Sequence, residues 1–340
     1  MNRKQIILMV LTMVIALLTA CGSNAEESSA IENQNEPIVF KLTHIESQNS
    51  DWQKTAEKFN EELSNLSNGR MTVETFPAGQ LGPEADMVEQ IIAGNTDFGI
   101  ITNAYMGTRD AEALNAWFMP FLFSKIEDAS KMRESDSAKQ MLEELEKQGI
   151  KGMDYLFAGN HHVLMKNGGM ISGPDDVTGK KIRVIGNPVV QDFWMRAGAS
   201  PISLPLTEVY MALETGIVDG IHMSIDGTAT SQFYEVADDL SLLSQISFPA
   251  IVMMSKVTYD SLSSEDQKIV EEAMKIAVDW GIEKVISSEE EYLNELEEKN
   301  VNIHTVDDLD SGFQEIRDAM YEEYSETNPL IKKFIEEVQE

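Results

Sequence analysis

The chain has 340 residues, enough for about two domains, and its composition of 42% hydrophobic and 25% charged residues is that of a folded globular protein. Its 58 acidic and 26 basic residues give a formal net charge of −32 at pH 7, which excludes nucleic acid as a partner because the phosphate backbone would be repelled. The same charge gives no general attraction for small anions, so an anionic ligand needs a cation placed beside it.

The N-terminus has the pattern of a targeting segment. Arg3 and Lys4 precede an apolar run up to Ala20 that is shorter than the ~20 residues a transmembrane helix needs. The run ends in "LTAC", which resembles a bacterial lipobox, so residues 1–20 are predicted to be a lipoprotein signal peptide and Cys21 the lipidated N-terminus. The alternative is an ordinary cleaved signal peptide.

Cys21 is the only cysteine of the sequence, so the folded part has no internal disulfide and no thiol chemistry. A lipid anchor therefore explains this residue better than a nucleophile does. Residues 21–36 are rich in Ser, Asn, Glu and Ala and lack apolar periodicity, which predicts a flexible tether. The expected location is extracytoplasmic, with the protein anchored by lipid to the cell membrane.

Strands and helices alternate after residue 37. A strand over residues 37–45 precedes a helix with its N-cap at Ser50, and a second strand over residues 70–76 precedes a helix with Pro83 as its first residue. Residues 97–102 are a third strand. The apolar face of the first helix follows spacings of three and four: Trp52, Ala56, Phe59, Leu63 and Leu66. This order predicts a parallel sheet with helices on its faces.

The middle of the chain repeats this order. A loop and strand over residues 177–185 lead into the helix "NPVVQDFWMRAGA", and the short strand "SPISLP" precedes a helix expected to be capped by Thr207 and ended by Gly216. Residues 218–225 are again typical of a strand. Two such units predict a bilobed α/β architecture.

A long helical pattern begins at Ser264, which forms a capping box with Gln267, and continues to about Asn300. A helix of that length, roughly 50 Å at 1.5 Å per residue, exceeds one small domain and is expected to cross both lobes. The heptads of a coiled coil are not sustained. The predicted lobes are residues 37–159 with about 249–285, and residues 160–248 with about 286–340.

Signatures of enzymes and of metal sites are missing from the sequence. It contains no GxSxG, no HExxH, no Walker loop and no GxGxxG after a strand. The adjacent His161 and His162 would point to opposite faces of a strand, which disfavours a shared metal. We therefore expect no enzyme, no metal and no cofactor.

One cluster of positive charge stands out in this acidic chain. The segment "GKKIRVIGNP" (179–188) brings three cations together before a turn. If Ile182 and Val184 face the core, Arg183 projects from the opposite face near the carboxyl end of its strand, where open α/β sheets bind ligands. An arginine there can form a bidentate pair with a carboxylate. The alternative is a solvated cluster without a ligand.

Two long segments resemble a known family. Residues 73–100, "VETFPAGQLGPEADMVEQIIAGNTDFGI", are similar to the amino-terminal signature of the DctP-type solute-binding proteins of TRAP transporters. Residues 175–223, "DDVTGKKIRVIGNPVVQDFWMRAGASPISLPLTEVYMALETGIVDGIHM", resemble the central signature of that family. The similarity extends from Val39 to about Asn300. It implies a periplasmic-binding-protein-like fold of two α/β domains joined by hinge strands and by a long helix that spans both lobes.

The resemblance also implies a ligand site. In the family the arginine of "IRV" pairs with the substrate carboxylate, and Arg183 occupies that position. Many members carry a second arginine earlier in the chain, where this sequence has His161. The remaining candidates for the cleft, each with a structural alternative, are His44, Trp52, Asn103, Asn187, Leu206, His222 and Met223.

The expected function is to capture an organic acid with an arginine clamp in the interlobe cleft and to deliver it to the subunits of a TRAP-type permease. The protein is expected to act as a monomer. Because His161 is largely neutral at pH 7, the ligand should carry one principal carboxylate and a less charged remainder, apolar or aromatic, against Leu206, Met223 and Trp52. The alternatives are a binding protein of a sensory system and, less favoured, a cell-surface enzyme.

Overall fold

The computed structural model describes residues 37–306 and 309–339. The predicted signal peptide, the lipidated Cys21 and the tether lie outside the described residues. Among the residues that are described, no helix combines the length and the apolar character needed to cross a membrane.

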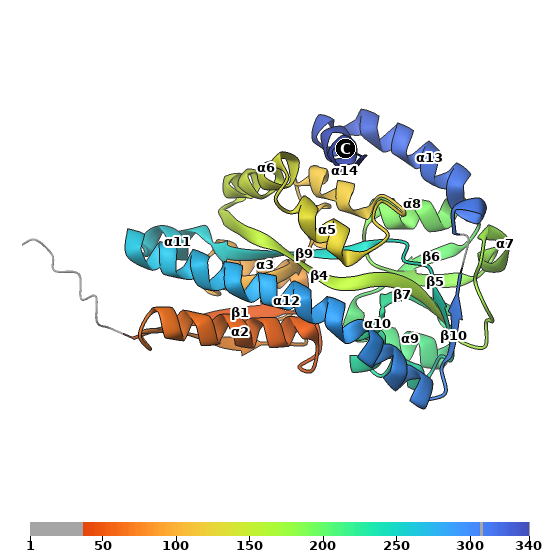
Figure 1. Ribbon diagram of the computed structural model, residues 1–340, viewed down its shortest axis with the longest axis horizontal. Helices are drawn as coiled ribbons and strands as arrows, with labels where there is room; N and C mark the ends of the chain where they lie inside the picture. The colour runs from red at the N-terminus through yellow and green to blue at the C-terminus, as the bar shows by residue number, and fades with distance from the viewer. Residues whose placement is uncertain (1–36, 307–308, 340) are drawn as a thin grey trace, which may run out of the picture. The chain divides into compact units, whose positions relative to one another are not determined.

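A ten-stranded sheet organises the chain, and its main path has the order β2-β1-β3-β9-β4-β7-β5-β6 (Figure 1). Off this path, β8 pairs with β4 and β10 pairs with β8. In chain order the strands are β1 Ile38–His44, β2 Met71–Phe76, β3 Phe98–Thr102, β4 Ile150–Met165, β5 Lys181–Val184, β6 Ser200–Ser203, β7 Gly220–Ser224, β8 Asp239–Leu242, β9 Ser247–Ser255 and β10 Asn302–Thr305.

The sheet consists of two parallel groups joined by antiparallel strands. β2, β1 and β3 are parallel to each other and form the first strand group, and β7, β5 and β6 are parallel and form the second strand group. The central β9 and β4 are antiparallel to their neighbours. The predicted parallel sheet is therefore confirmed within each group but is wrong for the middle, where β4 pairs with β9 as far as Asn160 and with β7 from His161 onward.

The helices of the first group follow the predicted periodicity. α2 (Asp51–Leu66) has Ser50 as its N-cap, and its apolar face is buried as far as Leu63. α3 (Glu84–Ile92) differs slightly from the prediction, because Pro83 is its N-cap and Glu84 its first residue. The other elements of this part are α4 Asn103–Met106, η1 Glu112–Phe118, α5 Ile126–Met132, α6 Asp136–Glu144 and η2 Leu145–Gln148.

The helices of the second group include one correction. α8 (Pro188–Arg196) begins after Asn187 as expected, and α9 (Val209–Thr215) ends at Gly216, whose φ of 74° is left-handed. Thr207 does not cap α9, because it lies inside the 3-10 turn η3 (Leu206–Glu208) that precedes the helix. The other elements are α7 Pro174–Val177, α10 Ile225–Thr230 and η4 Phe233–Glu235, whereas α11 Lys256–Ser261 packs on β9 and β4 beside the first group.

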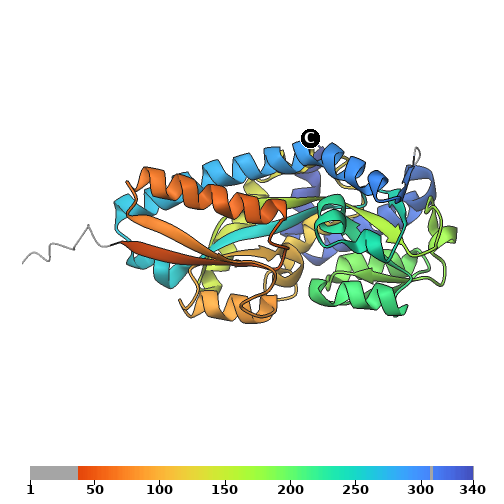
Figure 2. The same ribbon diagram turned by 90° about the horizontal axis from the view of Figure 1, so that it is seen from below.

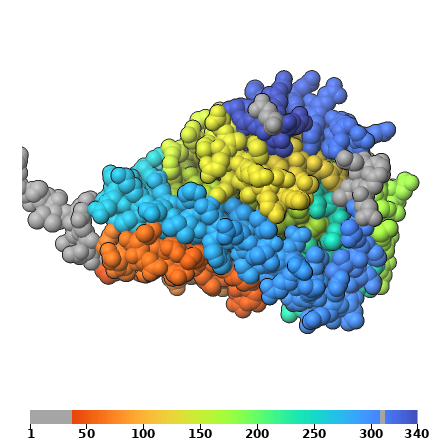
Figure 3. All heavy atoms as spheres, viewed as in Figure 1, coloured from red at the N-terminus to blue at the C-terminus, as the bar shows by residue number. Residues whose placement is uncertain are grey.

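The long helix α12 (Ser264–Glu298) runs past both strand groups, as Figures 1 and 2 show. Its N-cap is Ser263, which accepts a hydrogen bond from the backbone N–H of Asp266, so the predicted capping box at Ser264 was displaced by one residue. The helix packs on α2 and β4 at one end and on α10 at the other. Figure 3 shows it as a continuous band beside α2.

Two C-terminal helices complete the fold. α13 (Leu309–Thr327) packs on α8, whereas α14 (Pro329–Gln339) packs on η1 and α6. Within this contact the ring of Phe334 lies 4.6 Å from that of Trp117. These two helices therefore contact elements beside both strand groups, and the predicted division of residues 286–340 stays a prediction.

Candidate ligand-binding site

Arg183 lies in β5 with only 4% of its surface exposed. Its Nε and Nη2 donate hydrogen bonds of 3.1 and 2.9 Å to the carbonyl oxygen of Leu204, in the segment after β6. These bonds hold one edge of the guanidinium in place. Burial lowers the pKa of Arg183 to about 10 while Glu46 acts in the opposite direction, so the residue is still a cation at neutral pH.

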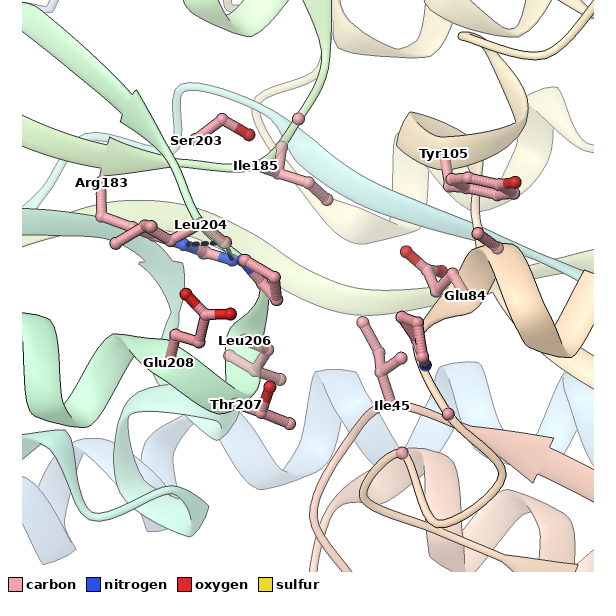
Figure 4. Close-up of a pocket in the computed structure, with 16 residues that line it drawn as sticks. Ile45, Glu84, Tyr105, Arg183, Ile185, Ser203, Leu204, Leu206, Thr207 and Glu208 are labelled. Atoms are coloured by element: carbon pink, nitrogen blue, oxygen red, sulfur yellow. Dashed lines mark hydrogen bonds between the residues drawn. The ribbon is translucent and has the colours of Figure 1, made fainter.

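A cavity of about 610 Å³ opens beside this arginine, a size suited to a small-molecule ligand (Figure 4). Its wall comes from segments that follow strands of both groups. The first group contributes Ile45, Glu84 and Tyr105, among others, and the second contributes Arg183, Ile185 and residues 203–208. Leu206, a residue implied by the family resemblance, belongs to this wall. Of the described wall residues, Arg183 is the only Lys or Arg.

Glu84 faces the cavity from the first turn of α3. Its carboxyl group accepts hydrogen bonds from the backbone N–H and the hydroxyl of Thr102, at 2.7 and 3.0 Å. Burial raises the pKa of Glu84 to about 7, and the two bonds from Thr102 limit that rise. Since Glu208 also lies in the wall, the described wall holds two acidic side chains and one cation, Arg183, beside which an anionic ligand is favoured.

His161 and His222 form a buried pair on one face of the sheet. They lie diagonally across the β4–β7 pairing, with ring centroids 4.8 Å apart, and His161 also stacks on Phe248 at 4.3 Å. None of their four ring nitrogens has a hydrogen-bond partner in the described part of the chain. Burial, and then the neighbouring charge of Arg183 and further histidines, holds the pKa of both rings well below 6.5. Both are neutral at pH 7.

Further buried polar groups without partners come from other elements. Glu46, two residues after β1, is 3% exposed, and its Oε2 finds no hydrogen-bond partner among the described residues. Burial, followed by the charge of Asp226, raises the pKa of Glu46 to about 8, with Arg183 opposing, so the carboxyl is mostly protonated at pH 7. Asn103 and Gln245 are fully buried, and neither amide group is paired within the described chain. Unpaired buried polar atoms are costly, so they indicate a missing partner.

Sequence reasoning missed Glu46, Glu84 and Gln245. Glu46 and Glu84 were hidden among 58 acidic residues, whose number prevents any selection by composition. A signal for Glu46 did exist, because it follows the carboxyl end of a parallel strand, where α/β sheets bind ligands. Gln245 carried no comparable signal.

The sequence profile of the bacterial extracellular solute-binding protein family 7, DctP, matches residues 42–328. The chain belongs to this family. It is 26% identical over 299 residues to the C4-dicarboxylate-binding protein DctB of Bacillus subtilis, covering 88% of this chain and 85% of the relative. A sugar acid binding protein of Advenella mimigardefordensis, solved in complex with galactonate, is 27% identical, with a TM-score of 0.81 over 89% of this chain and 97% of that one. A TRAP periplasmic solute binding protein of a Sulfitobacter species with bound β-D-galacturonate has the same identity and TM-score, over 87% of this chain and 98% of that one.

Family 7 membership confirms two predictions made from the sequence, the DctP-type resemblance and the bilobed α/β fold. The first and second strand groups are the sheets of the two lobes, and β4, β9 and α12 pass between them. Relatives of this kind are solute-binding proteins of transport systems rather than enzymes.

Four of the predicted site residues make hydrogen bonds or apolar contacts inside the protein. His44 Nε2 pairs with Gln53 Oε1 at 3.1 Å, and burial lowers the pKa of His44 to about 4. The Nε1 of Trp52 donates to the carbonyl oxygen of Phe157 at 3.2 Å. Asn187 caps α8 through its Oδ1. Met223 is buried in an apolar cluster on the face of β7 opposite His222. Their predicted contacts with ligand stay predictions.

Metal binding has no candidate in the described ranges, where no group of three His, Cys, Asp or Glu side chains could hold an ion. His161 and His162 occupy successive positions of β4, which places their side chains on opposite faces of the strand. His162 Nδ1 accepts a hydrogen bond from the backbone N–H of Ser244 at 3.1 Å, so this ring is bonded to the loop between β8 and β9.

Proposed function

We propose that this protein captures an organic acid outside the cytoplasm and delivers it to a TRAP-type permease, with Arg183 holding the ligand carboxylate. The observation that carries the proposal is Arg183 itself, a cation 4% exposed beside a cavity in a strongly acidic protein. Burying a charge is costly unless it is paired, and no carboxylate lies within ion-pair distance of Arg183 in the described chain. An anionic ligand supplies that partner.

The geometry of the guanidinium supports a directed contact. Because Nε and Nη2 are both engaged by Leu204, the side chain is held in one rotamer before the ligand arrives. Its other nitrogen, Nη1, makes no hydrogen bond to the described residues and is free to donate. A charge-assisted bond in a site shielded from water is stronger than the same bond at the surface.

The ligand class follows from the neutral groups near Arg183. His161, His222 and protonated Glu46 can donate or accept hydrogen bonds, but none of them cancels a second full negative charge. A monocarboxylate with several hydroxyl groups carries a single charge for Arg183 and offers hydrogen-bond partners to these neutral groups. This proposal departs from the apolar remainder expected from the sequence, because the unpaired buried atoms are polar. The galactonate and galacturonate bound by two relatives belong to this class.

Membrane attachment is the second part of the proposal. The lipobox-like "LTAC" and the sole cysteine support lipidation of Cys21, and residues 21–36 would then serve as a tether long enough to leave the folded part free beside the membrane. Mass spectrometry of the mature protein tests this point. A diacylglycerol adduct on an N-terminal Cys21 is expected, whereas an unmodified N-terminus elsewhere would contradict the anchor.

A thermal-shift screen tests the ligand proposal. D-galactonate and D-galacturonate should raise the melting temperature, and D-galactose and galactonamide, which lack the carboxylate, should not. Succinate is the dicarboxylate comparison. If succinate stabilises the protein more than every hydroxylated monocarboxylate, the proposed ligand class is wrong, and if no carboxylate stabilises it, the organic-acid proposal fails as well.

A further inference from the structure

A polar contact joins the two lobes outside the cavity wall. Asp51 is the first residue of α2, beside the first strand group, and Asp226 lies in α10, directly after β7 of the second group. The backbone N–H of Asp51 donates a hydrogen bond of 3.4 Å to Oδ2 of Asp226. A carboxyl group of one lobe thus lies at the positive N-terminus of a 16-residue helix of the other.

Lys54 and Tyr292 complete this contact. The Tyr292 hydroxyl donates to Oδ1 of Asp51 at 3.3 Å, and Lys54 Nζ donates to the same oxygen at 2.8 Å and to the Tyr292 hydroxyl at 3.0 Å. Lys54 belongs to α2, whereas the ring of Tyr292 packs in the apolar cluster of the second lobe with Met223 and Ile225. Opening the lobes would therefore separate Asp51 and Lys54 from Asp226 and Tyr292. None of these four residues lines the cavity beside Arg183.

The contact is incomplete in one respect. Asp51 and Asp226 are 1% and 6% exposed, and each keeps one carboxyl oxygen, Oδ2 of Asp51 and Oδ1 of Asp226, without a partner in the described residues. Two ionised carboxylates in one buried contact repel each other. A single proton on Asp226 removes that repulsion and leaves its other oxygen free to accept from the Asp51 N–H.

We propose that Asp226 and Tyr292 are positioning residues that hold the lobes together, and that this contact weakens as Asp226 loses its proton. The residues act through closure of the lobes and not by touching the ligand. Ligand affinity would then depend on a contact remote from Arg183, because closure and ligand binding share one conformational equilibrium.

The charges around Asp226 determine the direction of the pH effect. Asp51 and Lys54 face it from α2, Glu46 from the segment after β1, and Tyr292 and Glu289 from α12. Burial, and then the charge of Asp51, raises the pKa of Asp226 to about 7.

In a solvent-exposed, open arrangement the same carboxyl would titrate near its ordinary pKa of ~3.9. At any pH between these two pKa values, closing the lobes therefore takes up a proton on Asp226. The stabilisation of the closed arrangement by this proton is fully present below the lower pKa and is lost as the pH rises through about 7.

Small-angle X-ray scattering of the ligand-free purified protein tests the proposal. At pH 5.5 the wild-type profile should fit the closed structure, and at pH 8.0 its radius of gyration should increase. Asp226→Asn should remove this increase, because its Oδ1 can accept from the Asp51 N–H while its Nδ2 donates to the unpaired Asp51 Oδ2. Tyr292→Phe should give a larger radius than wild type already at pH 5.5.

The matched control is Glu84→Gln. The pKa of Glu84 is also raised to about 7, but its hydrogen bonds are to Thr102 inside the first lobe. The radius of gyration of this variant should therefore still increase with pH. Lys54→Met, at a partly exposed position, is a second probe if Tyr292→Phe fails to fold, and it should also increase the radius at pH 5.5. An unchanged wild-type radius between the two pH values, or an Asp226→Asn variant that expands as wild type does, overturns the proposal. The measurement contains no ligand, so its outcome is independent of the proposed ligand class.

Discussion

The rings of His161 and His222 meet edge to face, with centroids 4.8 Å apart and an interplanar angle of 78°, and all four ring nitrogens are buried without a hydrogen-bond partner in the described chain. Interior polar atoms normally have partners. In a solute-binding protein of family 7, a pair of neutral donors and acceptors near a buried arginine fits hydroxyl groups of a solute better than a second carboxylate.

Arg183→Ala should abolish most of the affinity for hydroxylated monocarboxylates. The lost charge-assisted hydrogen bonds are worth roughly 1.5–3 kcal/mol, which corresponds to about a ten-fold to hundred-fold weaker Kd. Isothermal titration calorimetry with D-galactonate measures the change. Arg183→Lys should also weaken binding, because an ammonium group cannot reproduce the planar fork. A wild-type Kd in the alanine variant would refute the clamp.

Affinity should fall as the pH rises through about 8, the pKa of buried Glu46. Above that value the carboxyl becomes an anion close to the ligand carboxylate and repels it. Glu46→Gln keeps the shape and removes the charge, so its Kd should increase less between pH 7 and 9 than the wild-type Kd does. Titrations of both proteins with D-galactonate provide the comparison, and equal slopes would argue against this role of Glu46.

The structure determines how a ligand contact of His161 depends on pH. With its ordinary pKa near ~6.5, a His161 beside the ligand carboxylate would strengthen binding as the pH falls through that range. Burial holds the pKa of His161 well below that value. We therefore expect His161→Ala to weaken binding by a similar factor at pH 6 and at pH 8, as measured by calorimetry. A loss much larger at pH 6 would show that the imidazolium is the binding form.

Gly281→Ala should destabilise the protein although alanine favours helices. A Cβ at Gly281 would collide with Thr55 of α2 and would lie 3.1 Å from Leu156 Cδ1 of β4. Overpacking of this kind costs about 1–3 kcal/mol, which urea denaturation would detect. Lys284→Ala, one turn along α12, is the control and should change the free energy of unfolding little. An unchanged midpoint for Gly281→Ala would mean that α2 and α12 can separate without cost.

Phe334→Ala tests whether α14 belongs to the core. The ring of Phe334 is fully buried and packs against Trp117 and Phe123 at 4.6 and 6.2 Å. Truncation of a buried phenylalanine costs roughly 3–5 kcal/mol. The expected result is a large drop in the denaturation midpoint. A drop no larger than that of an exposed substitution such as Lys332→Ala would show that the C-terminal helices are dispensable.

Local patterns in the sequence were sufficient for several of the elements and for the family. The spacing of Trp52, Phe59 and Leu63 predicted the buried face of α2, because a helix brings every third or fourth residue to one side. The "KKIRV" segment predicted a strand, and the structure buries its arginine. Caps were less certain, and Thr207 and Ser264 were wrong, since a cap depends on the backbone of one or two residues that neighbouring contacts can shift.

Only the tertiary structure decided which distant polar groups meet. Asp51 and Asp226 are 175 residues apart, and His161 approaches His222 because β4 pairs with β7 in one register. The antiparallel β9 between the two parallel groups was equally invisible to local periodicity. Nor could the sequence assign a pKa of about 8 to Glu46, because that value arises from loss of solvent and from charges on other elements. Periodicity is encoded in near neighbours, whereas desolvation exists only once the two lobes have packed.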